Sequence, residues 1–115
     1  MSYMLLLMEP LGQRRERGVA DGHAVYDLML GYAENLKARG VLLQTSSLRE
    51  DAVRLNMRAG RSHVTDGPFT EAKELIGGFF LLDCATREEA LGFAAQCPAA
   101  EWATIEVRET GPCYD

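Results

Sequence analysis

Short apolar segments and one long helical pattern alternate along the chain and predict a mixed α+β protein. Residues 3–8 are continuously apolar, as in a strand that is buried on both faces. From Asp21 apolar residues recur every three or four positions, which predicts a helix that Asp21 caps and that ends at Gly40. The apolar face predicted for this helix consists of Val25, Leu28, Met29, Tyr32 and Leu36.

The middle of the chain predicts a strand followed by a β-hairpin. Residues 41–48 are apolar at first and polar toward their end, as expected for a second strand. Residues 52–58 alternate between apolar and polar side chains, and Ala59-Gly60 then provides a turn into residues 61–66.

The last third predicts a strand, a helix and a further strand. Residues 75–83 form an apolar strand, in which the Gly77-Gly78 pair indicates a bulge or a close backbone approach. A T-x-x-E capping box begins a second helix at Thr86, and Pro98 ends it. Residues 102–109 alternate as a half-buried strand, with Trp102 on the face opposite Ile105.

This order of elements predicts a single domain, residues 1–115, with a ferredoxin-like βαββαβ fold and an inserted β-hairpin. Right-handed crossovers place both helices on one face of an antiparallel sheet. The first strand nevertheless presents Met4, Leu6 and Met8 to the other face. Because soluble monomers rarely expose a large apolar patch, we expect a homodimer that forms through the sheet faces.

Composition narrows the expected partners. The chain is 47% hydrophobic and 25% charged, with a formal net charge of −5, so direct nucleic-acid binding is not expected. The basic cluster of Arg14, Arg15 and Arg17 is interpreted as part of a solvated loop. Three cysteines without CxxC spacing favour a reducing cytoplasm. No membrane span, metal site, nucleotide motif or other cofactor site is predicted.

The densest passage is SHVTDGPFTEAKELIGGFFLLD, residues 62–83, and turn chemistry explains much of it. The Asp66 carboxylate can accept hydrogen bonds from turn amides. Gly67 is expected to adopt a backbone conformation that other residue types cannot adopt, and Pro68 restricts its own φ. Thr70 is expected to cap a single helical turn.

A functional interpretation uses the same residues. Here Asp66 lies at the mouth of a cleft, burial raises its pKa, and Glu74 is a second acid–base group. His63 is a weaker candidate as a partner of Asp66. The predicted ligand-binding residues, which would bind an anionic group and form an apolar wall around it, are Arg58, Gly67, Pro68, Phe69, Lys73 and Tyr32.

Residues 64–79, VTDGPFTEAKELIGGF, resemble the signature of the YCII-related family, specifically its DGPF branch. The resemblance implies a dimeric α+β barrel of ferredoxin-like subunits. The His–Asp pair that suggests enzyme activity in this family lies in the first helix of its other branch. When the positions are counted back from Gly40, the residues nearest to the family's His and Asp are Met29 and Ala38. The His–Asp pair is therefore not carried over to this chain.

Two functional hypotheses follow. The first is a cofactor-free cytoplasmic protein that binds or transforms a small polar or anionic metabolite around Asp66. The second is a non-catalytic dimeric regulatory module, because some DGPF-type domains are associated with sigma factors of transcription initiation. The fold alone does not choose between them, since one fold hosts unrelated functions.

Overall fold

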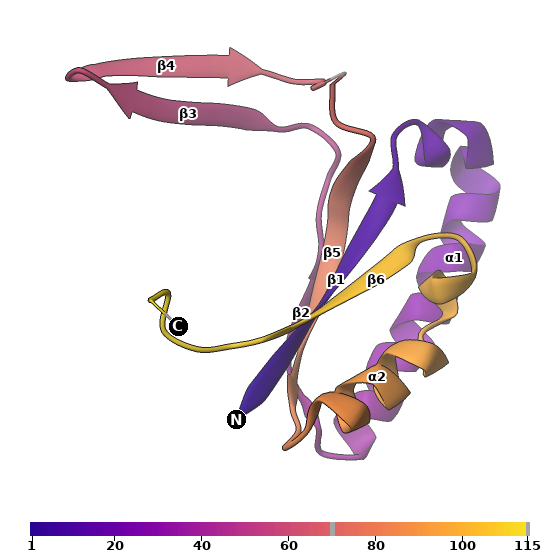
Figure 1. Ribbon diagram of the computed structural model, residues 1–115. Helices are drawn as coiled ribbons and strands as arrows, with labels where there is room; N and C mark the ends of the chain where they lie inside the picture. Colours follow the sequence, from indigo (N-terminus) through magenta and orange to yellow (C-terminus); the bar gives the residue numbers. More distant parts are fainter. Residues whose placement is uncertain (70, 115) are drawn as a thin grey trace.

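The computed structural model describes residues 1–69 and 71–114, and its elements confirm the predicted ferredoxin-like α+β fold with an inserted hairpin (Figure 1). The elements are β1 (Ser2–Pro10), α1 (Gln13–Ala38), β2 (Leu42–Ser47), β3 (Val53–Arg58), β4 (Arg61–Asp66), β5 (Glu74–Asp83), α2 (Arg87–Gln96), the 3₁₀ helix η1 (Pro98–Glu101) and β6 (Thr104–Glu109).

The main sheet has four strands in the order β2-β5-β1-β6, and every neighbouring pair is antiparallel. Figure 1 shows α1 and α2 together on one face of this sheet, as the right-handed crossovers predict. We call the other side the outer face. Its apolar side chains are only partly buried, including Met4 and Leu6 of β1 and Phe79 and Leu81 of β5.

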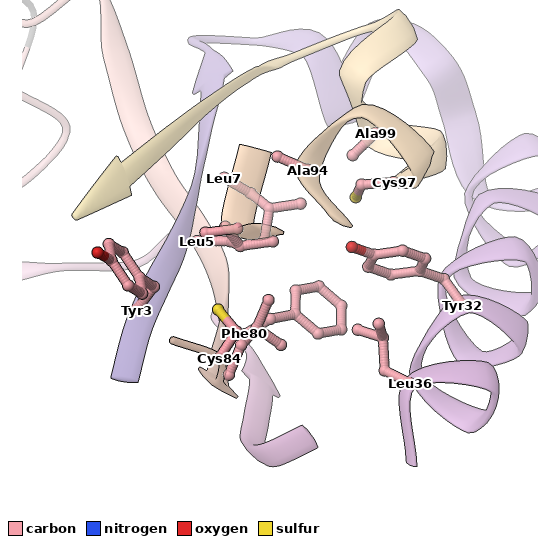
Figure 2. Packing of buried hydrophobic residues seen from close by; sticks show 12 residues of the cluster. Tyr3, Leu5, Leu7, Tyr32, Leu36, Phe80, Cys84, Ala94, Cys97 and Ala99 are labelled. Carbon is pink, nitrogen blue, oxygen red and sulfur yellow. The ribbon is translucent and has the colours of Figure 1, made fainter. Parts of the chain in front are cut away.

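The core lies between the helices and the inner face of the sheet (Figure 2). Leu5, Leu36 and Leu82 are fully buried within it. The Tyr32 ring meets the Phe80 ring edge-on, with centroids 5.1 Å apart. Burying these side chains stabilises the fold by roughly 1.5–3 kcal/mol each, and it fixes the C-terminal half of α1 against the sheet.

The start of α1 differs from the prediction. The helix begins at Gln13, so the basic cluster is helical rather than part of a loop, and Asp21 lies inside the helix instead of capping it. Gly18 explains the difference, because its φ of 81° and ψ of 170° kink the helix there and interrupt the apolar periodicity. The predicted end is confirmed, since Gly40 has a φ of 75° and its N–H reaches the carbonyl of Lys37.

The second half of the chain follows the predicted pattern with one further difference. The Glu89 amide donates to Thr86 Oγ1 at 3.2 Å, which confirms the cap of α2. Trp102, however, precedes β6 and ends η1, a short helix that the alternating pattern did not indicate. Trp102 therefore packs beside the core instead of lying on the outer face with the alternate residues of β6.

The hairpin of β3 and β4 forms a separate two-stranded sheet. Its turn is as predicted, and both Ala59 and Gly60 have positive φ, which suits the right-handed twist of a hairpin. Figure 1 shows the hairpin projecting from the sheet on the side away from the helices. It therefore adds nothing to the core beneath α1 and α2.

Candidate functional site

The principal cleft lies between the sheet and the N-terminal half of α1. Tyr32 and Leu36 hold the other half of the helix against the core, whereas residues such as Tyr26 and Leu30 remain 54% and 42% exposed. The space beneath this half measures about 810 Å³. Its lining comprises Leu7, Glu9, Arg14, Arg15, Arg17, Gly18, Val19, Gly22, Val25, Tyr26, Met29, Leu30, Ala33, Thr45, Ser46, Ser47, Gly77, Gly78, Phe80, Ala99 and Trp102.

A partly buried ion pair lies at one end of the cleft, where β1 leads into α1. Arg14 Nε donates to Glu9 Oε1 at 2.9 Å, and Arg14 Nη2 donates to Glu9 Oε2 at 3.1 Å. The remaining donors of Arg14 reach the carbonyls of Leu48 at 2.8 Å and Gly77 at 3.1 Å. The hydrogen bond to Glu9 raises the pKa of the Arg14 guanidinium. Arg14 therefore joins β1 and β5 to Leu48, the residue that follows β2.

The glycine pair of β5 makes room for this ion pair. Gly77 is the extra residue of a bulge, since Leu7 is opposite Gly78 and Met8 is opposite Ile76. A Cβ atom on Gly77 would come within 1.8 Å of Glu9 Oε2. The predictions of a bulge and of a close backbone approach are both confirmed, and the side chains that approach are those of the cleft.

A second group of side chains lies around Trp102. Arg17 sits over the indole ring, with its guanidinium carbon 5.6 Å from the ring centroid, and Arg17 Nη2 donates to Gln13 Oε1 at 3.2 Å. Gln13 in turn donates from Nε2 to the carbonyl of Trp102 at 2.6 Å. The first turn of α1 is thereby connected to η1 across the cleft.

The residues predicted from the motif occupy a different part of the molecule. Asp66 is exposed at the end of β4, opposite Val53, and its carboxylate makes no hydrogen bond to another described residue. The N–H of Gly67 donates to the Ala52 carbonyl at 2.9 Å. Gly67 does not have a positive φ, so the predicted special conformation is wrong. Crowding favours glycine instead, because a Cβ there would lie 3.1 Å from that carbonyl oxygen.

The ligand-binding residues predicted with Asp66 are not brought together in the single chain. Arg58 lies at the tip of the hairpin, whereas Asp66 lies at its base. Tyr32 is buried in the core, and its hydroxyl donates to the Phe93 carbonyl at 2.6 Å. Figure 2 shows the Tyr32 ring among the side chains of the core. His63 lies on the face of β4 opposite to that of Asp66, because the two residues are three positions apart in the strand.

At the base of the hairpin the neighbour of Phe69 is Arg54 rather than Arg58. The Arg54 guanidinium carbon lies 3.7 Å from the Phe69 ring centroid, and Arg54 Nη1 donates to Glu71 Oε1 at 3.1 Å. Pro68, which precedes Phe69, is exposed, as are Lys73 and Glu74 at the start of β5. Thr70, the predicted cap, lies outside the described residues.

Sequence reasoning did not identify the residues of the cleft. Glu9 and Arg14 are ordinary charged residues beside a polar segment, and Trp102 was assigned to the wrong face. The one useful signal was the Gly77-Gly78 pair, which marked a close approach without naming the groups that approach. None of the residues predicted around Asp66 lines the cleft.

Two further features limit the candidate chemistry. Within residues 1–69 and 71–114, no group of three or more His, Cys, Asp or Glu side chains is arranged to hold a metal ion. In the same part of the chain, the helices are all too short or too polar to cross a membrane.

Comparison with known proteins gives a family match over nearly the whole chain. The model of the YCII-related domain matches residues 1–112. An uncharacterized protein, R00369 of Rhizobium meliloti (strain 1021), is 48% identical over 59 residues. That alignment covers 50% of this chain and 48% of the relative, so the matched segment spans about half the length of that protein.

A solved structure has the same fold. It is 5-chloro-2-hydroxyhydroquinone dehydrochlorinase (TftG) from Burkholderia phenoliruptrix AC1100, in complex with 2,5-dihydroxybenzoquinone. The TM-score is 0.57 at 17% sequence identity, and the superposition covers 96% of this chain and 94% of the other. At this identity the likeness establishes the fold.

Proposed function

The chain belongs to the YCII-related family, and from this premise we propose that it binds a small organic anion with an apolar body in the cleft beneath α1. The observation that carries the proposal is the combination of a large apolar cavity with a surplus of positive charge. The proposed role is binding, and the proposed ligand is one molecule per cleft.

The size and lining of the cleft suit a small molecule. Ligand sites typically measure about 300–1,000 Å³ and are mostly apolar with a few polar groups that orient the ligand. The volume here, about 810 Å³, lies within that range. The apolar lining comes from both sides of the space, including Leu7 and Phe80 from the sheet and Met29 and Leu30 from the helix.

The charge of the lining favours an anion. Three arginines and one glutamate line the cleft, which gives a net charge of +2 in a chain whose net charge is −5. Glu9 is neutralised by Arg14, so Arg15 and Arg17 supply the surplus. Arg17 is positioned by Gln13 and Trp102, and a guanidinium held in this way can donate to a carboxylate or phenolate.

The comparisons support a small-molecule role. TftG was solved with a bound dihydroxybenzoquinone, which is a small cyclic molecule with acidic oxygens. Met29, the residue nearest to the histidine position of the family, lines the cleft of this chain. A methionine supplies apolar surface and no proton transfer, so we propose ligand binding rather than acid–base catalysis at this position.

Trp102 gives a direct test, because it is the only tryptophan of the chain and it lines the cleft. We expect 1-naphthoate to shift the indole N–H resonance of Trp102 in a saturable way, and the neutral 1-naphthamide to bind at least about tenfold more weakly. Arg17→Gln should weaken naphthoate binding about tenfold, whereas the control Arg54→Gln should leave it unchanged. Equal affinities for the acid and the amide would contradict the proposal.

The site predicted at Asp66 stays a prediction, and the same titration tests it. Binding centred on Asp66 and Glu74 requires Asp66→Asn to weaken the affinity for naphthoate. Binding in the cleft requires the affinity of this variant to equal that of the wild type. The alternative of a regulatory module linked to transcription initiation likewise stays a prediction.

We also propose that two copies form a homodimer through the outer faces of their sheets. The outer face presents partly buried Met4, Leu6, Phe79 and Leu81 with no helix above them in the described part of the chain. Sedimentation equilibrium of the wild type should give the mass of two chains at micromolar concentration, and Leu6→Asp should give the mass of one. A wild type that remains monomeric at 100 µM would overturn the dimer.

A further inference from the structure

We propose that the β3–β4 hairpin, residues 53–66, is an arm that holds a second copy of this chain, with its apolar face packed on the outer sheet face of that copy. Within the described residues, β3 and β4 pair only with each other, and every residue of both strands is exposed. An isolated two-stranded hairpin is marginally stable in water. The arm therefore needs a surface that the single chain does not supply.

The two faces of the arm differ sharply. Cross-strand pairing places Leu55 opposite Val64, and the neighbouring apolar residues Val53 and Met57 share this face, with Asp66 and Ser62 opposite them at its two ends. These four side chains are 55–65% exposed. The opposite face carries Arg54, Asn56, Arg58, Arg61, His63 and Thr65. A strand pair that is apolar on one side and polar on the other is the pattern of a sheet with one covered face.

The surface area of the chain shows how much remains to be covered. The chain exposes 8216 Å², whereas a compact monomer of 12.7 kDa exposes about 6,200 Å². Its radius of gyration is 16.0 Å, against about 13 Å for a compact domain of 115 residues. The excess of about 2,000 Å² exceeds the roughly 800 Å² that each partner buries in a standard interface. An extensive dimer of this chain would bury an area of this size.

The position of the arm points to the outer face of a second copy. Figure 1 shows the arm leaving the main sheet on the side away from the helices, so the arm and the outer face form two sides of a corner. A second sheet placed against the outer face would enter this corner and meet the arm. The outer face of that second sheet offers apolar partners, including Leu6 and Phe79.

Charge favours contact between arm and body over contact between two arms. The arm carries three arginines and one aspartate, which give it a net charge of +2. The rest of the chain, here called the body, therefore carries −7, because the whole chain has a net charge of −5. Two arms repel each other, whereas an arm and the body of another copy attract each other. The second copy is therefore a complementary occupant in both charge and apolar surface.

This inference rests on the proposed homodimer, and the first experiment separates the two. The dimer dissociation constant is measured by sedimentation for the wild type and for Leu55→Asp, which places a charge on the apolar face of the arm. The matched control is Asn56→Asp, one residue along the same strand and on the opposite face. We expect Leu55→Asp to raise the constant at least about 100-fold, because a two-fold dimer loses both contacts, and Asn56→Asp to change it less than about fivefold.

Each outcome has a defined meaning. If Leu6→Asp abolishes the dimer while Leu55→Asp behaves as Asn56→Asp does, the sheet-face dimer holds and the role of the arm is overturned. If the wild type is monomeric, both proposals fall. If the arm variants keep the dimer of the wild type and only bind another protein less well, the occupant is that protein and the inference is overturned.

A second measurement needs no variant, so it stays decisive if Leu55→Asp misfolds. Mixed dimers are prepared from one copy with ¹³C-labelled methyl groups and one unlabelled copy. We expect intermolecular nuclear Overhauser effects between the methyl groups of Leu55 or Met57 and protons of Leu6 or Phe79 in the other copy. Dimers in which the arm methyl groups contact only their own chain would overturn the inference.

Discussion

Two Arg–Glu ion pairs, one in the cleft and one on the hairpin, are similar in length and very different in surroundings. Arg14 and Glu9 approach to 2.9 Å with side chains that are 31% and 14% exposed. Arg54 and Glu71 approach to 3.1 Å with side chains that are 57% and 72% exposed. Each pair lies near a glycine in crowded surroundings, so residue type and spacing do not distinguish them.

Burial gives the two pairs different consequences. The remaining N–H groups of Arg14 donate to two backbone carbonyls. Loss of Glu9 would therefore leave the positive charge of Arg14 unpaired in a partly desolvated place. Arg54 lies over Phe69 in contact with water, where an ion pair contributes about 0–1 kcal/mol. The conspicuous motif thus contributes Glu71 to the weaker pair, whereas the inconspicuous residues Glu9 and Arg14 form the pair on which local structure depends.

The largest difference is expected between two glycine substitutions. Gly77→Ala should lower the free energy of unfolding by about 3 kcal/mol, because the new methyl group overlaps Glu9 and displaces the ion pair. Gly67→Ala should lower the free energy of unfolding by about 1 kcal/mol, since the nearest atom to the added Cβ is a carbonyl oxygen at 3.1 Å. Urea denaturation of both variants measures the difference. Equal losses of stability in the two variants would contradict the expected difference between the two ion pairs.

Removing one charge from each pair should give the next largest difference. Glu9→Gln is expected to lower the free energy of unfolding by about 2 kcal/mol, less than for a fully buried pair because Arg14 keeps some exposure. The matched change Glu71→Gln should cost at most about 0.5 kcal/mol. Thermal and urea unfolding at pH 7 compare the two, and a loss for Glu71→Gln as large as that for Glu9→Gln would refute the assignment.

A buried hydroxyl extends the comparison to pH. Burial raises the pKa of Tyr32, whose hydroxyl donates to the Phe93 carbonyl. An unfolded tyrosine ionises near pH 10, so the unfolded state loses this proton first and stability should fall as the pH rises above about 10. Tyr32→Phe should cost about 1 kcal/mol at pH 7 and should remove this part of the alkaline decline. Tyr26→Phe, at a 54% exposed position, is the control.

The smallest expected effect is the response to salt. A double-mutant cycle of Arg54→Gln and Glu71→Gln should give a coupling of about 0.5 kcal/mol at low salt and nearly none in 1 M NaCl. The corresponding cycle for Arg14→Gln and Glu9→Gln should retain more than half of its coupling, because the pair is partly shielded from ions. Similar salt responses in the two cycles would show that burial does not separate them.

Local patterns predicted most of the elements correctly. The hairpin followed from alternation and the Ala59-Gly60 turn, and the cap of α2 followed from Thr86 and Glu89. The prediction failed at the start of α1, because Gly18 and three arginines have the composition of a loop. Arg14 is held by groups from β1, from β5 and from Leu48 after β2, and no local pattern records such contacts.

The candidate site was harder to predict than the fold. A signature such as residues 64–79 is contiguous and draws attention to itself, whereas the cleft gathers Glu9, Arg14, Gly77 and Trp102 from four separate segments. The sequence indicated the close approach at Gly77 but not its partner. Proximity between distant segments is a property of the sheet order, which brings β1 between β5 and β6.

By itself, the sequence determined the order of elements, the hairpin, the capped second helix and the family, because these depend on local periodicity and on contiguous motifs. Only the tertiary structure decided that Arg14 is partly buried with Glu9, that the N-terminal half of α1 stands away from the sheet, and that the hairpin projects without a surface of its own. The physical reason is that burial depends on which distant segments meet, and it is burial that separates the ion pair in the cleft from the one on the hairpin.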